Sequence, residues 1–331
     1  MNTAVLEATA KRLVAEPKGI LAIDESMSTC NKRFEKLGVP TTEEKRRDYR
    51  DLLVSAPNIE RYVSGYIMFD ETMRQKTLAG VPFPEVLKQK GIDPGIKVDI
   101  GTQDLALHEG EKITEGLDGL RTRFAEYKTM GATFAKWRAV ITISDTLPSE
   151  ACLHANASVM AQYAALAQEV DIVPIVEPEV LIDGTHSIER CAEVVSKTLD
   201  ILFSELAIAG VHIPGVILKT SMVLSGKEAA NRATQEEVAK KTVEVLKAHV
   251  PKDIGGIVFL SGGQSDEDAT MHLNLMHKEK LPWPLTFSYG RGIQNPALMA
   301  WAKNPEDVSL AQTLLVERAK ANSLASIGKF A

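Results

Sequence analysis

The sequence predicts a TIM (β/α)8 barrel that spans residues 1–331 as a single α/β domain with a short C-terminal segment. β-rich runs alternate with helical stretches, eight such runs are present, and no linker or change in composition divides the chain. Alternation of this kind predicts parallel strands joined by helical crossovers, and eight strands predict a closed barrel. An open, doubly wound sheet is the alternative fold.

The expected strands are short β-rich runs between the helical stretches. In chain order they are Gly19–Ser26, Tyr62–Phe69, Gly95–Ile100, Phe134–Val140, Ile172–Pro178, Gly215–Ser221, Gly256–Gly262 and Pro284–Gly290. The expected helices show apolar residues at the helical period and contain good helix formers. Among them are Thr42–Ser55, Leu117–Met130, His154–Gln168, Ser187–Ala207 and Gln235–Ala248.

The composition is that of a folded globular protein, with 44% hydrophobic and 25% charged residues. A formal net charge of −6 argues against nucleic acid as a partner, because a phosphate backbone requires a basic surface. Cys30, Cys152 and Cys191 are widely separated, which predicts no disulfide framework and a reducing compartment. The N-terminus lacks a basic region followed by an apolar stretch, and no run is long enough to cross a bilayer. We therefore expect a cytoplasmic protein without a membrane partner.

Polar and charged side chains gather at the C-terminal ends of the expected strands, where barrels of this type place their active sites. Residues two apart on a strand point to the same side. The residues concerned are Asp24 and Ser26, Lys97 and Asp99, Lys136 and Arg138, Glu177 and Glu179, and Lys219. A solvated strand end explains one such pair, but not five strand ends that direct opposite charges toward one axis.

Lys219 lies within the otherwise apolar run Gly215–Val223. Burial of an ammonium group is costly and favours the neutral amine, which attack on a carbonyl and Schiff-base formation require. The alternative is a lysine at a strand end that reaches into solvent. This run alone does not decide between the two.

Glycine-containing segments follow the seventh and eighth expected strands, Leu260–Ser265 and Phe287–Gly292. Loops at these two positions are the usual phosphate site of such barrels, and Arg291 lies in the second of them. We therefore expect these segments to bind a phosphate group of the substrate. The alternative is that their glycines only form turns. No histidine lies at a strand end in a ligand-like pair, and His272 and His277 are five residues apart, so we expect no metal and no cofactor.

Seven segments together resemble class I fructose-bisphosphate aldolase, and the resemblance covers nearly the whole chain in order. These segments are Leu21–Ser26, Gly95–Asp99, Phe134–Arg138, Ile172–Glu179, the run around Lys219, Phe259–Ser265 and Leu285–Arg291. The resemblance implies a metal-independent lyase of glycolysis and gluconeogenesis. Such an enzyme cleaves fructose 1,6-bisphosphate reversibly to dihydroxyacetone phosphate and glyceraldehyde 3-phosphate through a lysine Schiff base.

The resemblance also implies roles for five residues. Lys219 matches the Schiff-base lysine, and Asp24 matches the carboxylate near the C4 hydroxyl. Glu177 matches the general acid and base that assists loss of water from the carbinolamine, a task suited to a carboxyl group whose pKa is raised by burial. Lys136 matches a second lysine that disfavours protonation of Lys219, and Glu179 is expected as the hydrogen-bonding neighbour of Lys136.

The substrate's two phosphates and the assembly follow from the same resemblance. The C1 phosphate is expected at Ser261, Gly262, Gly290 and Arg291. The C6 phosphate is expected at Ser26, Thr29, Lys32, Arg33, Lys97 and Arg138. Members of the family are commonly tetramers, so a homo-oligomer is expected, with a small phosphosugar as the other partner.

The sequence departs from the family pattern in three places. After Ser323–Lys329 it ends at Ala331, where many members continue to a terminal tyrosine that is associated with protonation of the enamine, so we expect slow C3 proton exchange or another proton donor. Met27–Thr29 replaces Thr-Gly-Ser, and Thr220 with Ser221 replaces Pro-Asn, which leaves the preferred substrate length open. A Schiff-base enzyme for another phosphosugar, such as sedoheptulose 1,7-bisphosphate, is one alternative. A non-catalytic phosphosugar-binding scaffold is the other.

Overall fold

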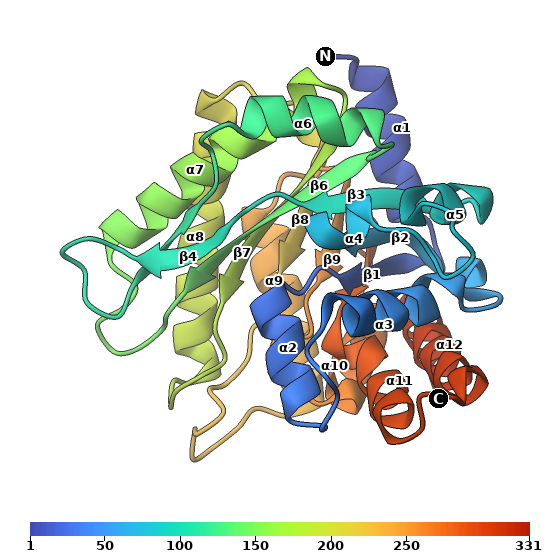
Figure 1. The fold of residues 1–331 in the computed structure, drawn as a ribbon. Helices are drawn as coiled ribbons and strands as arrows, with labels where there is room; N and C mark the ends of the chain where they lie inside the picture. The colour runs from blue at the N-terminus through green and yellow to red at the C-terminus, as the bar shows by residue number, and fades with distance from the viewer.

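The computed structural model describes residues 1–331 and shows a closed barrel of eight parallel strands (Figure 1). The barrel strands are β1 (Gly19–Ile23), β2 (Val63–Met68), β3 (Asp93–Lys97), β6 (Phe134–Ile141), β7 (Val173–Val180), β8 (Ile217–Thr220), β9 (Gly256–Phe259) and β10 (Leu285–Tyr289). They follow one another around the barrel in chain order, and β1 pairs in parallel with both β2 and β10. This closure confirms the TIM barrel and excludes the open sheet.

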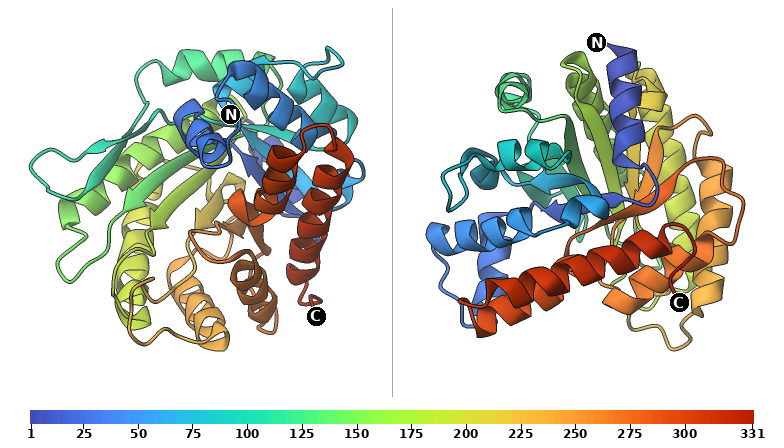
Figure 2. Two further views of the ribbon diagram at one scale, coloured as in Figure 1. Left: turned by 60° about the horizontal axis from the view of Figure 1, so that its bottom comes forward. Right: turned by 90° about the vertical axis from the view of Figure 1, so that its right-hand side faces the viewer.

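Helices surround the barrel on its outside (Figure 2). They are α1 (Thr3–Leu13), α2 (Met27–Glu35), α3 (Glu43–Ser55), α4 (Asp70–Arg74), α5 (Phe83–Gln89), α6 (Leu120–Thr129), α7 (Glu150–Glu169), α8 (Ile188–Ile208), α9 (Gln235–His249), α10 (Asp266–Met276), α11 (Arg291–Lys303) and α12 (Val308–Ala325). All five helices expected from the periodicity are present as α3, α6, α7, α8 and α9. None of the helices combines the length and apolarity that spanning a membrane requires.

Two apolar clusters hold the fold together. The larger one fills the space between the barrel and the surrounding helices, where Trp137 of β6 packs on Tyr163 of α7 with ring centroids 5.5 Å apart. The smaller one lies inside the barrel and includes Ile67, Ile175 and Val258, together with Leu6 and other residues of α1. Because α1 contributes to this inner cluster, it closes the barrel at the end opposite the candidate site.

The expected strands run three residues beyond the observed C-terminal ends of β1, β3 and β9. At these points the chain leaves the sheet for local reasons. The Ser26 side chain accepts a hydrogen bond from the N–H of Thr29 and caps α2. Gly262 has φ of +45°, a conformation that favours glycine. After β3 the chain enters an unexpected antiparallel hairpin, β4 (Gly101–Asp104) and β5 (Lys112–Glu115).

Candidate active site

A cavity of about 1040 Å³ opens at the C-terminal ends of the barrel strands. All fifteen residues that the sequence proposes for the site line this cavity. They are Asp24, Ser26, Thr29, Lys32, Arg33, Lys97, Lys136, Arg138, Glu177, Glu179, Lys219, Ser261, Gly262, Gly290 and Arg291. Residues that are distant in the sequence therefore meet at one place, as the barrel topology predicts.

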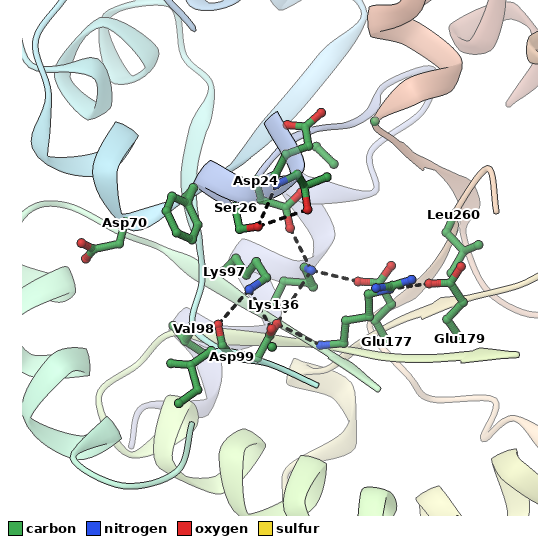
Figure 3. Close-up of a pocket in the computed structure, with 18 of the residues that line it drawn as sticks. Asp24, Ser26, Asp70, Lys97, Val98, Asp99, Lys136, Glu177, Glu179 and Leu260 are labelled. Carbon is green, nitrogen blue, oxygen red and sulfur yellow. Dashed lines mark hydrogen bonds and ion pairs between the residues drawn. The ribbon is translucent and has the colours of Figure 1, made fainter. Parts of the chain in front are cut away.

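Lys219 and Lys136 share the carboxylate of Glu177 at the floor of the cavity. The Lys219 Nζ atom lies 3.1 Å from Glu177 Oε1, and the Lys136 Nζ atom lies 3.2 Å from Glu177 Oε2. Lys136 also pairs with Asp24 (Figure 3), and its Nζ atom lies 2.8 Å from Asp24 Oδ2. Lys219 is only 4% exposed, which excludes the alternative of a lysine that reaches into bulk solvent.

The electrostatics of this cluster keep its carboxylates ionised. Burial would raise the pKa of Asp24, but the cations of Lys136 and Lys219 outweigh burial and hold the pKa well below its usual value. Burial likewise disfavours the charged form of Lys136, and Asp24, Glu177 and Asp99 reverse this effect, so that the pKa of Lys136 lies above its usual range. Lys136 is therefore a fixed cation in the cavity.

The direction of the Glu177 pKa differs from the expectation. The sequence predicted that burial raises it, and burial is indeed the largest influence. However, Lys136, Lys219 and then Arg138 oppose burial, and together they lower the pKa of Glu177 below 4.5. In the free protein Glu177 is thus a carboxylate that accepts protons rather than an acid that donates them.

We expect the stability of the fold to reveal the ion pair of Asp24. The folded-state pKa lies below the usual value of 3.8, so the stabilisation is fully present above about pH 4 and is lost as the pH falls through the folded pKa. Below pH 4, the unfolding free energy of the wild type should therefore fall more steeply than that of Asp24→Asn. Urea unfolding of both proteins between pH 2 and pH 7 measures this difference, and parallel curves below pH 4 would contradict it.

The sequence analysis expected Glu179 to be the hydrogen-bonding neighbour of Lys136, but Glu179 has a different partner. Its Oε2 atom instead pairs with Arg138 Nε. In the pairing of β6 with β7, Lys136 lies beside Ile175 and Arg138 beside Glu177, so Glu179 is nearer along the strands to Arg138 than to Lys136. The guanidinium of Arg138 therefore meets the carboxylate of Glu179. Glu179 holds Arg138 at the rim, while Glu177 serves the two lysines.

Asp99 is a member of the site for which the sequence analysis proposed no role. It is 6% exposed, and its Oδ1 atom lies 2.7 Å from Lys97 Nζ. Its Oδ2 atom accepts a hydrogen bond from the N–H of Arg138 and lies 4.0 Å from Lys136 Nζ. The signal in the sequence was its spacing of two from Lys97. Asp99 orients Lys97 and adds negative charge beside Lys136 (Figure 3).

Hydroxyl groups and cations mark the side of the cavity at the start of α2. Ser26 donates a hydrogen bond to the Thr29 hydroxyl at 3.1 Å, and Ser28 lies 3.1 Å from the same Ser26 oxygen. The N-terminus of a helix favours anions because its N–H groups are unpaired. Lys32 is exposed in the last turn of this short helix and makes no ion pair.

A second anion-binding arrangement lies after the neighbouring strands β9 and β10. Ser261 and Gly262 follow β9, and α11 begins at Arg291 directly after Gly290. Arg291 is exposed and makes no ion pair. Ser288, which the sequence analysis missed, lines the same cavity with a buried hydroxyl group that has no protein partner.

The cavity is cationic although the protein is acidic. Ten Lys or Arg side chains and six Asp or Glu side chains line it, whereas the whole chain carries a formal net charge of −6. Such a concentration of cations favours a ligand with several negative charges. No group of three or more His, Cys, Asp or Glu residues is arranged to hold a metal ion.

Comparisons with known proteins agree on one family. Residues 5–331 match the family model described as "Fructose-bisphosphate aldolase class-I". A probable fructose-bisphosphate aldolase class 1 of Xanthomonas campestris is 54% identical, with 100% of this chain and 99% of the relative covered. The cytosolic fructose-bisphosphate aldolase 4 of Arabidopsis thaliana is 46% identical over 100% of this chain and 84% of its own length.

A solved structure shows the same fold. This is the fructose-bisphosphate aldolase of Plasmodium falciparum in complex with TRAP and a small-molecule inhibitor, which matches with a TM-score of 0.97. The two chains are 45% identical, and the match covers 99% of this chain and 95% of the other. The family model, the relatives and the shared fold together show that this chain belongs to the class I fructose-bisphosphate aldolase family.

Proposed function

We propose that this aldolase cleaves fructose 1,6-bisphosphate to dihydroxyacetone phosphate and glyceraldehyde 3-phosphate through a Schiff base on Lys219. One observation carries the proposal: the buried Lys219 amine lies 3.1 Å from Glu177 at the floor of a cationic cavity. The named relatives are fructose-bisphosphate aldolases, which favours this substrate over sedoheptulose 1,7-bisphosphate.

The first stage joins the enzyme to the substrate. Glu177 accepts a proton from Lys219, whose neutral amine then attacks the C2 carbonyl to form a carbinolamine. Loss of the C2 hydroxyl as water requires a proton donor, and Glu177 is within reach to return the proton. Lys136 keeps its charge throughout and stabilises the negative charge that develops on the substrate oxygen.

The second stage breaks the bond between C3 and C4. Asp24 accepts the proton of the C4 hydroxyl, the electron pair of the C3–C4 bond moves into the protonated imine, and the aldehyde product leaves. A carboxylate with a lowered pKa is fully ionised at neutral pH, and the bond to Lys136 orients it. Protonation of the enamine and hydrolysis of the imine then release dihydroxyacetone phosphate.

The two ends of the cavity are proposed to hold the two phosphates. Ser261, Gly262, Gly290 and Arg291 are the groups for the C1 phosphate. Ser26, Thr29, Lys32, Arg33, Lys97 and Arg138 are the groups for the C6 phosphate. In the present structure Lys97 and Arg138 are bound to Asp99 and Glu179. These two cations therefore exchange or share partners when the substrate enters.

Reduction with borohydride in the presence of dihydroxyacetone phosphate tests the reaction class. The imine should become a stable secondary amine, and peptide mapping by mass spectrometry should place it on Lys219. An adduct on another lysine, or none, would refute the proposed mechanism. Activity should also survive incubation with a chelator, because the imine performs the polarisation that a metal ion performs in the metal-dependent mechanism.

Three further proposals concern the location, the folding and the assembly of the protein. As the name of the cytosolic Arabidopsis relative suggests, we propose a cytosolic location. We also propose that residues 1–331 form one cooperative folding unit, which calorimetry tests as a single transition. A homo-oligomer is proposed by family resemblance, and light scattering coupled to size-exclusion chromatography measures its mass.

A further inference from the structure

Arg33 connects two neighbouring helices, α2 and α11, which follow the paired strands β1 and β10. It projects from α2, and its Nη1 atom pairs with Glu25 and donates a hydrogen bond to Gln294 Oε1 at 3.3 Å. Its Nη2 atom donates to Asn295 Oδ1 at 3.2 Å. Gln294 and Asn295 belong to α11. Three protein acceptors therefore hold a guanidinium group that the sequence analysis assigned to phosphate binding.

Arg50 in turn holds Glu25 in place. The Oε2 atom of Glu25 lies 3.0 Å from Arg50 Nη1, and the backbone carbonyl of Glu25 accepts a hydrogen bond from Arg50 Nη2 at 3.3 Å. Arg50 is only 2% exposed and belongs to α3, none of whose residues lines the cavity. Gln294 is anchored too, because Tyr49 donates its hydroxyl hydrogen to Gln294 Oε1 at 2.8 Å. Arg33 thus lies between Glu25 and Gln294, and a buried residue holds each of them in place.

The position of this network relates it to the substrate. The helix α2 begins with the hydroxyl groups proposed for the C6 phosphate, and α11 begins at Arg291, which is proposed for the C1 phosphate. Contacts that tie α2 to α11 therefore fix the separation of the two phosphate subsites. Binding of a substrate with two phosphates depends on this separation, because both subsites must be occupied at once. Binding of a substrate with one phosphate does not depend on it.

We propose that Glu25 is a positioning residue that holds Arg33 between α2 and α11 and thereby sets the spacing of the two phosphate subsites. This inference rests on the proposed function. The carboxylate is required because it faces two guanidinium groups, which only donate hydrogen bonds. A glutamine at this position offers one acceptor oxygen and turns an NH₂ group toward one of the arginines, so that Arg33 loses its anchor.

Steady-state kinetics of Glu25→Gln with two substrates tests the proposal. The KM for fructose 1,6-bisphosphate should rise roughly tenfold, the effect of losing a hydrogen bond to a charged group, with kcat changed much less. With fructose 1-phosphate, which lacks the C6 phosphate, kcat/KM should change less than about twofold. If Glu25→Gln impairs folding, Asn295→Ala removes another acceptor of Arg33 and should show the same split on a smaller scale.

Glu71→Gln provides the matched control. Glu71 also pairs with an arginine of α3, Arg46, and its side chain is 16% exposed against 14% for Glu25, yet it does not line the cavity. This variant should leave both KM values unchanged. Equal losses with the two substrates in Glu25→Gln, or kinetics identical to those of Glu71→Gln, would overturn the proposal. Trapping of dihydroxyacetone phosphate on Lys219 in both variants would show that the proposed function stands even so.

Discussion

Lys219→Met should lose roughly four or more orders of magnitude in kcat for cleavage of fructose 1,6-bisphosphate. Enzymes accelerate their reactions by about 10⁶-fold or more, and here the electron sink that accepts the C3–C4 bonding pair exists only as an imine on this nitrogen. Methionine has nearly the shape of the lysine stem and suits a site that is 4% exposed, so the fold should persist. Coupled assays for triose phosphate measure the loss.

Two further variants separate the covalent role of Lys219 from its charge. Lys219→Arg keeps a cation beside Glu177 but provides no amine for the imine, so it should be as inactive as the methionine variant. Lys90→Met removes a partly buried lysine outside the cavity whose Nζ atom donates to the Ala56 carbonyl, and it should retain activity. Substantial cleavage by Lys219→Arg would show that the charge is sufficient and that no imine forms.

The barrel was predictable because its signals are local and repeated. Each barrel strand is a short β-rich run followed by a helical stretch. Such alternation predicts a parallel sheet, and the presence of eight units predicts that the sheet closes into a barrel. The hairpin β4–β5 gave no such signal because its strands are short and largely polar, and the residues of β4, such as Thr102 and Gln103, are mostly exposed. The buried Thr114 ties β5 to the barrel by donating its hydroxyl hydrogen to the Arg138 carbonyl, a contact between segments that are separate in the sequence.

The candidate site was predictable where a residue occupies a strand end. The alternation of side chains identified Lys136, Glu177 and Lys219 as neighbours before any distance was known. The predicted partner of Glu179 was wrong because alternation gives the direction of a side chain but not how far it extends. The structure had to decide that the guanidinium of Arg138, rather than the amine of Lys136, meets that carboxylate.

Other features of the site depend on contacts between distant elements. Arg50 lies on α3 and Gln294 on α11, and nothing in their local sequence relates them to Glu25 or Arg33. The lowered pKa of Glu177 has the same origin, since burial is a local property whereas the opposing cations arrive from two other strands. Sequence patterns therefore indicate which groups enter the cavity, and packing determines how they are partnered.

Glu177→Gln should lower kcat by roughly 10² to 10⁴-fold, the range for loss of a positioned acid and base. The argument starts from the cations that depress its pKa. When Lys219 becomes a neutral carbinolamine, one of these cations disappears, and burial, the largest influence on this carboxyl, then raises its pKa. Glu177 thereby gains a proton-donating form at the stage when the C2 hydroxyl must leave, and glutamine cannot supply that proton.

The stage at which Glu177 acts can be read from trapping rates. If it assists loss of water, the imine forms late, so borohydride trapping of dihydroxyacetone phosphate should slow by about the same factor as kcat. Glu111→Gln is the matched control, because Glu111 is a buried carboxyl group that binds Ser149 outside the cavity. Normal trapping combined with a low kcat would instead assign Glu177 to the cleavage step, because the imine would then form without its help.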